Sequence, residues 1–115
     1  MDDKEFMDLM NELKEYLERE KIFIQNPARY DEVVRATEIA KELFVDCDIA
    51  IKDDPIQMGA AILCIDGYDI IIRGTREIKL FSELISKANN FEIYPVGNER
   101  MRFSLLFADV FTKIV

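Results

Sequence analysis

The chain has 115 residues, half of them apolar and a third charged, and its 23 acidic and 15 basic side chains give a net charge of −8. This length and apolar content predict a single globular domain over residues 1–115 with a core of its own. The sequence contains no histidine, which excludes Ser-His-Asp or Cys-His catalysis and metal sites that use imidazole.

Two amphipathic helices are predicted in the N-terminal part of the chain. Residues 3–21 repeat apolar side chains at the i, i+4, i+7 spacing of one helical face. Asn26 followed by Pro27 is typical of a helix start, and this second helix should continue to about Phe44. Residues 22–24 are apolar and predict a short link that tucks under the second helix.

After the second helix, the apolar pattern changes from a helical period to a period of two. Residues 45–52 alternate apolar and polar side chains, which predicts a half-buried strand with an acidic exposed face. Residues 56–65 are apolar on both faces and predict a central strand covered on both sides. Asp66-Gly67 favours a tight hairpin turn, with residues 68–73 as the returning strand.

The C-terminal part predicts one helix and two or three strands. Thr75 is the expected N-cap of the helix. Residues 91–96 predict a short strand, and Pro95 favours an edge position for it. Residues 101–107 predict another strand, and 108–115 fit either a strand or a helix. We favour a continued strand with a bulge near Asp109, whose free edge would pair with a second chain in a homodimer.

The resulting order α-α-β-β-β-α-β-β predicts an α+β fold. We expect two layers, with a mostly antiparallel sheet of about five strands and the helices packed on the sheet. The charge imbalance belongs to the N-terminal half, because residues 1–60 hold 16 acidic and 8 basic side chains and residues 61–115 hold seven of each. The acidity therefore predicts one polarised face.

Four carboxylates form the densest acidic cluster in the sequence: Asp46, Asp48, Asp53 and Asp54. Oxygen ligands of this kind suit Mg²⁺ or Ca²⁺, but their spacing matches no calcium-binding loop. We therefore expect no metal here and interpret the four residues as a partner-binding acidic patch.

A second group of residues lies at the start of the third helix. Arg73, Thr75 and Arg76 would place two guanidinium groups beside a helix N-terminus, an arrangement that favours anions. The surrounding sequence contains no phosphate-binding glycine motif. Anion binding at this point is therefore the alternative to the acidic patch.

Cys47 and Cys64 lie in apolar runs, and no secretory signal is found, so both are expected to be reduced core thiols in a cytoplasmic protein. The net negative charge argues against direct contact with nucleic-acid phosphates and anionic membranes. No apolar run is long enough to cross a membrane.

The residues together predict a non-catalytic protein-protein interaction or regulatory module. Its acidic N-terminal face would bind another protein, for which a basic surface would be complementary, without a cofactor and without a catalytic residue. Two alternatives remain open: a small-molecule or anion-binding domain that uses Arg73 and Arg76, and a structural homo-oligomer subunit held together by pairing of sheet edges.

Overall fold

A four-stranded antiparallel sheet lies at the centre of the fold, with strand order β2-β3-β5-β4. The computed structural model describes residues 1–67, 72–97 and 99–113, and within them it has three helices and two antiparallel sheets. In chain order the elements are α1 (Asp3–Arg19), β1 (Ile22–Ile24), α2 (Pro27–Leu43), β2 (Asp48–Asp53), β3 (Ala61–Gly67), α3 (Thr75–Lys87), β4 (Asn90–Pro95), β5 (Met101–Phe107) and β6 (Phe111–Lys113).

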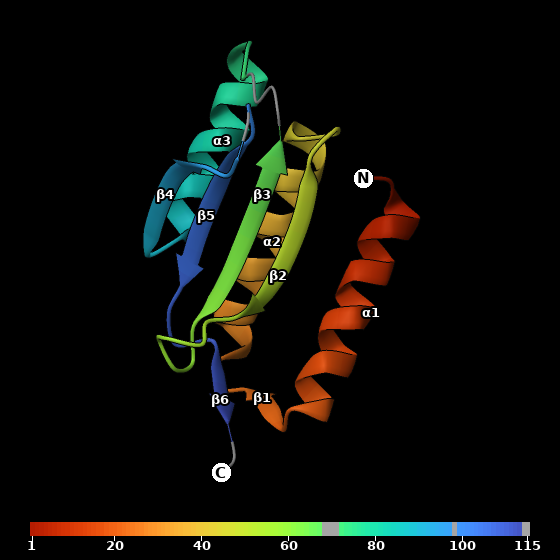
Figure 1. Cartoon of the computed structure of the whole chain (residues 1–115), viewed down its shortest axis with the longest axis vertical. Helices are drawn as coiled ribbons and strands as arrows, with labels where there is room; N and C mark the ends of the chain where they lie inside the picture. Colours follow the sequence, from red (N-terminus) through yellow and green to blue (C-terminus); the bar gives the residue numbers. More distant parts are fainter. Residues whose placement is uncertain (68–71, 98, 114–115) are drawn as a thin grey trace.

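Two of the helices cover one face of the large sheet, and this arrangement confirms the predicted α+β fold. Figure 1 shows α2 and α3 behind the sheet, whereas α1 lies beside the β2 edge. The buried side chains of β3 alternate along the strand: Leu63 and Ile65 are fully buried on the helix side, and Ile62 and Cys64 are half-buried on the other. Strand β3 is therefore central, as predicted, but it is completely buried on one face only.

Two of the three helix starts agree with the sequence. The side chain of Asp2 accepts a hydrogen bond from Glu5 N at 2.7 Å and caps α1. Asn26 Oδ1 caps α2 by accepting from Arg29 N at 3.2 Å. At α3 the predicted N-cap was wrong, because Thr75 is the first helical residue and Gly74 (φ 89°) takes the cap position without a side-chain bond.

The predicted hairpin turn at Asp66-Gly67 is also wrong. Both residues belong to β3 and pair with Arg102 and Met101 of β5. The Asp66 carboxylate accepts two hydrogen bonds from Arg102, at 2.6 and 2.9 Å, so a partner remote in sequence keeps this segment extended. Of the predicted return strand 68–73, residues 68–71 lie outside the described part of the chain, and the two that follow are not in a strand.

The strand predicted over residues 56–65 begins only at Ala61. The preceding residues form a loop in which Asp54 accepts a hydrogen bond from Ile56 N at 2.8 Å. Asp54 N in turn donates to Ala60 O at 2.9 Å, which closes the loop. Ile56 is consequently 92% exposed. Met58 is 80% exposed as well, so the large apolar side chains of this loop do not mark a buried strand.

The segment 22–24 is not a simple link but strand β1, which pairs antiparallel with β6. The strand predicted for 108–115 is confirmed over Phe111–Lys113, and the chain bends before it at Asp109, which has φ 59°. Over the described residues the last strand is not continuous, so the long free edge expected for it does not form: β5 lies between β3 and β4, and the separate strand β6 pairs on one side with β1. The edge position of β4 is confirmed.

Helix α1 is attached to the rest of the molecule along its full length. Met10, Leu13 and Leu17 are buried, and near the N-terminus Asp3 forms an ion pair with Lys41 of α2. None of the described helices combines the length and the apolar content that a membrane crossing requires.

Candidate functional site

Helix α1 carries a row of acidic side chains on its exposed face. The row, here called the acidic stripe, consists of Glu5, Asp8, Glu12 and Glu15. Their spacing of three, four and three residues places them on one side of a helix, and all four are exposed. Within the described part of the chain, no member of the stripe makes an ion pair. The stripe therefore presents uncompensated negative charge to solvent.

A groove between α1 and β2 runs beside the acidic stripe. This α1–β2 groove has a volume of about 410 Å³. It is lined by Leu9, Glu12, Leu13, Glu15, Tyr16, Arg19, Ala50 and Ile51. Apolar side chains from both elements thus lie next to two carboxylates of the stripe. Such a lining suits a segment that is both apolar and cationic.

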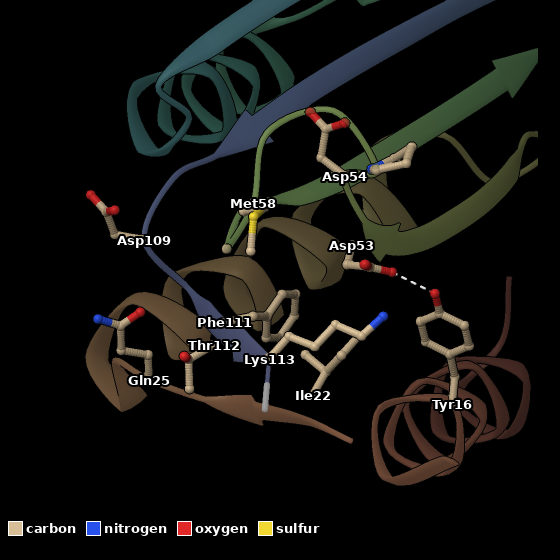
Figure 2. Close-up of a pocket in the computed structure, with 12 residues that line it drawn as sticks. Tyr16, Ile22, Gln25, Asp53, Asp54, Met58, Asp109, Phe111, Thr112 and Lys113 are labelled. Carbon is tan, nitrogen blue, oxygen red and sulfur yellow. Dashed lines mark hydrogen bonds between the residues drawn. The ribbon is translucent and has the colours of Figure 1, made fainter. Parts of the chain in front are cut away.

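A larger pocket begins at Tyr16, the residue that it shares with the α1–β2 groove. This end pocket, shown in Figure 2, has a volume of about 640 Å³. It is lined by Tyr16, Ile22, Gln25, Asp53, Asp54, Pro55, Met58, Gly59, Asp109, Phe111, Thr112 and Lys113. Its volume lies within the usual range of about 300–1,000 Å³ for ligand pockets. Because the two hollows meet at Tyr16, they form one surface along α1 and past the end of β2.

The end pocket combines an apolar part with charged groups. Figure 2 shows Ile22 and Phe111 close together, while the Lys113 side chain extends across the pocket toward Asp53. Three carboxylates and one amine line the pocket, so negative charge predominates here as it does on α1. Gln25, in the segment after β1, and Thr112, in β6, add hydrogen-bonding groups.

A hydrogen bond between Tyr16 and Asp53 connects α1 to the end of β2. The Tyr16 hydroxyl donates to Asp53 Oδ1 at 2.5 Å, as the dashed line in Figure 2 shows. Because this bond is made by the protonated phenol to a nearby carboxylate, it raises the pKa of Tyr16 to about 12. The bond fixes the ring at the junction between the groove and the end pocket.

We expect this bond to be visible in a titration of the tyrosines. The pKa of Tyr16 is raised in the folded protein, so its contribution to stability should be complete below pH 10 and should disappear as the pH rises from 10 to about 12. Ultraviolet absorbance of the phenolates measures the pKa, and urea unfolding at each pH measures stability. In Tyr16→Phe the titration step near pH 12 should be absent. If the variant retains this step, the bond is assigned to the wrong tyrosine.

The four residues of the predicted acidic patch lie at two separate places. Asp46 and Asp48 are at the start of β2, where Asp48 pairs with Arg100 at 3.3 Å, and Asp53 and Asp54 are at its end. Only the second pair lines the end pocket. Among the described residues no three His, Cys, Asp or Glu side chains come together as a metal-binding group. The structure thus joins Asp53 and Asp54 to α1 rather than to Asp46 and Asp48.

The predicted anion site lies at the start of α3, and its residues line neither the α1–β2 groove nor the end pocket. Arg76 forms ion pairs with Glu42 at 3.1 Å and Glu77 at 3.8 Å. A Cβ atom placed on Gly74 would lie 2.6 Å from Glu77 Oε2, so a carboxylate of the chain itself already lies by this helix N-terminus. Arg73 and Thr75 are exposed nearby. The geometry therefore does not favour an external anion here.

Both cysteines are free and half-buried rather than fully buried. Burial raises the pKa of the Cys47 and Cys64 thiols above the usual value, which reduces the fraction of reactive thiolate at neutral pH. Neither thiol lines the groove or the end pocket. They are consistent with the predicted reduced thiols and carry no part of the site.

The acidic stripe and the junction at Tyr16 were not predicted from the sequence. The spacing of the stripe was a readable signal, because four acids occur on one helical face. The contact between Tyr16 and Asp53 joins residues 37 positions apart and has no local signal. Compared with known proteins, the chain matches no family model, no curated protein and no solved structure.

Proposed function

We propose that the protein is a non-catalytic interaction module that binds a basic segment of another protein along α1 and β2. The observation that carries this proposal is the acidic stripe, whose four carboxylates have no ion-pair partner among the described residues. Two of them, Glu12 and Glu15, line a groove with apolar side chains. Unpaired charges at the rim of a surface attract and select an oppositely charged partner.

The shape of the surface supports an extended protein segment as the partner. The α1–β2 groove and the end pocket follow one another through Tyr16, so a segment lying in the groove would reach Asp53 and Asp54. An alternation of apolar and cationic side chains would match Leu9 and Leu13 on one side and the stripe on the other. In this proposal the end pocket accepts a terminal basic side chain of the partner.

The proposal involves no catalytic step, metal or cofactor. Binding is governed by charge and apolar contact, which fits a regulatory role better than an enzymatic one. The free, half-buried thiols support a reducing compartment, and we propose a cytoplasmic location on that basis.

The proposal is tested with a defined basic probe. A fluorescent peptide of alternating Lys and Leu residues, and a neutral analogue of alternating Gln and Leu, are titrated with the protein while anisotropy is recorded. The variant Glu12→Gln/Glu15→Gln removes two charges of the groove. The matched control Asp31→Asn/Glu99→Gln removes two exposed charges that line neither hollow.

We expect the wild-type protein to prefer the basic peptide, because only that peptide complements the stripe. The groove variant should bind it roughly fivefold more weakly, since each exposed charge pair contributes up to about 1 kcal/mol. The control variant should change the affinity by less than about twofold. Equal losses in both variants would mean that total charge alone attracts the peptide, and the groove would then have no role.

A further inference from the structure

The outer edge of β4 has no partner strand among the described residues. Strand β4 ends the sheet order β2-β3-β5-β4, and its other edge is paired with β5. Figure 1 shows it at one side of the molecule, with α1 at the opposite side. An open edge offers backbone N–H and C=O groups to another strand.

The register shows which backbone groups point outward. Val96 N donates to Arg100 O at 3.1 Å, so these two residues form a hydrogen-bonded pair of the β4–β5 ladder. Because such pairs alternate along antiparallel strands, Tyr94, Glu92 and Asn90 bond toward β5. Phe91, Ile93 and Pro95 therefore direct their backbone groups to the open edge. Proline has no N–H, so the outward donors are those of Phe91 and Ile93.

Apolar side chains flank this edge on the helix side of the sheet. Ile93 pairs with Phe103, which is buried on that side, yet Ile93 is 50% exposed. On α3, Ile78 is 54% exposed and lies one turn before Phe81, whose ring packs edge-on against Phe91 at 6.0 Å. Since α3 and β4 run in opposite directions (Figure 1), Ile78 and Ile93 follow this aromatic pair in the same direction. They form an apolar border along the edge.

We propose that β4 binds β4 of a second copy of this chain in an antiparallel pair centred on Ile93. In this register Ile93 N–H of each copy donates to Ile93 C=O of the other copy. Phe91 N–H donates to Pro95 C=O of the other copy, so both outward donors of each copy find an acceptor. The missing N–H of Pro95 leaves only the Phe91 carbonyl without a strand partner. A twofold axis at Ile93 thus forms four backbone bonds between the copies. A register centred on Glu92 would form as many, but it would place the two Glu92 carboxylates directly opposite each other.

The charge distribution permits self-association at this edge. Helix α3 and β4 together carry three basic residues (Arg76, Lys79, Lys87) and three acidic residues (Glu77, Glu83, Glu92), so these two elements bring no net charge to the interface. The acidic stripe lies on α1 beside β2, at the far end of the sheet. In the proposed register Glu92 faces Tyr94 of the second copy rather than the second Glu92. The dimer would display two acidic surfaces at its ends.

Sedimentation equilibrium tests the association. Over roughly 1 µM to 1 mM protein, we expect the wild-type chain to change from monomer to dimer. Ile93→Lys should remain a monomer throughout, because it places two like charges at the centre of the pair. Ile56→Lys, which alters a 92% exposed residue in the loop before β3, serves as the matched control and should dimerise like the wild type. A wild-type monomer over the whole range would overturn the proposal.

Cysteine cross-linking tests the register in a Cys47→Ser/Cys64→Ser background whose fold is checked by circular dichroism. In a hydrogen-bonded pair the two Ile93 Cα atoms would be about 5.5 Å apart, within the range of about 4.4–6.8 Å for disulfides. The two Glu92 Cα atoms would be roughly 8 Å apart. Oxidation should therefore link Ile93→Cys and not Glu92→Cys. Linkage of Glu92→Cys alone would overturn the Ile93-centred dimer, whereas the peptide-binding result for the acidic stripe would be unaffected.

Discussion

Substitution of Phe103 by alanine should lower the free energy of unfolding by about 3–5 kcal/mol, the usual loss for a large aromatic side chain in a core. Phe103 is 7% exposed on β5. Its ring packs edge-on against Phe44 at 5.6 Å and Phe91 at 5.7 Å, and it lies 6.1 Å from Phe81. These neighbours come from the end of α2, from β4 and from α3. One ring therefore joins both covering helices to the sheet.

Urea unfolding followed by circular dichroism measures this loss. Phe23→Ala is the matched control, because it removes the same side chain from a position on β1 that is 51% exposed. The control should cost less than about 1 kcal/mol. Equal unfolding midpoints for Phe103→Ala and the control would show that the Phe103 ring is not part of the core.

Helices and strands that are determined by residues close in sequence could be predicted from the sequence. The periodic apolar spacing defines α1 and α2, and the Asn26 cap that marks the start of α2 bonds to a residue only three positions away. The edge position of β4 follows from Pro95, since proline in a sheet is found mainly on an edge strand, where its missing N–H faces away from the neighbouring strand. These predictions hold because the forces that decide them act within one turn or one strand.

Elements decided by remote partners could not be predicted in the same way. Asp66-Gly67 has the composition of a turn, but the ion pair with Arg102, 36 residues later, keeps it in a strand. Residues 22–24 are too few to show a strand pattern, and their pairing with β6 involves the other end of the chain. In both cases tertiary pairing outweighs local preference.

The proposed functional surface likewise has features that local sequence predicts and features that depend on residues remote in sequence. The acidity of the N-terminal half was visible in the composition, and the stripe on α1 continues that signal with a regular spacing. Asp53 and Asp54 were predicted as part of one patch with Asp46 and Asp48, but the two pairs lie at opposite ends of the six-residue strand β2. The end pocket depends on the approach of β6 to the loop before β3, which no short segment of sequence encodes.

Gly59→Ala is expected to destabilise the fold by about 3 kcal/mol, through backbone strain and a steric clash. Gly59 has φ +84°, a conformation that L-residues rarely adopt. An alanine Cβ would lie 2.8 Å from the backbone oxygen of Phe111. That region cannot move away easily, because Val110 N and Phe111 N both donate to Gly59 O at 2.8 Å. The same bonds hold the loop before β3 against β6.

Gly97→Ala separates the two causes, since Gly97 has φ +81° and, its two chain neighbours aside, no described residue has an atom within 4 Å of its Cβ position. It should lose only the strain, about 1 kcal/mol, and the difference between the variants in urea unfolding measures the clash. Because Gly59 and Phe111 both line the end pocket, Gly59→Ala should also weaken binding of the basic peptide, whereas Gly97→Ala should not. Equal destabilisation by the two substitutions would mean that the loop can move away from β6, and the end pocket would then lack a fixed wall.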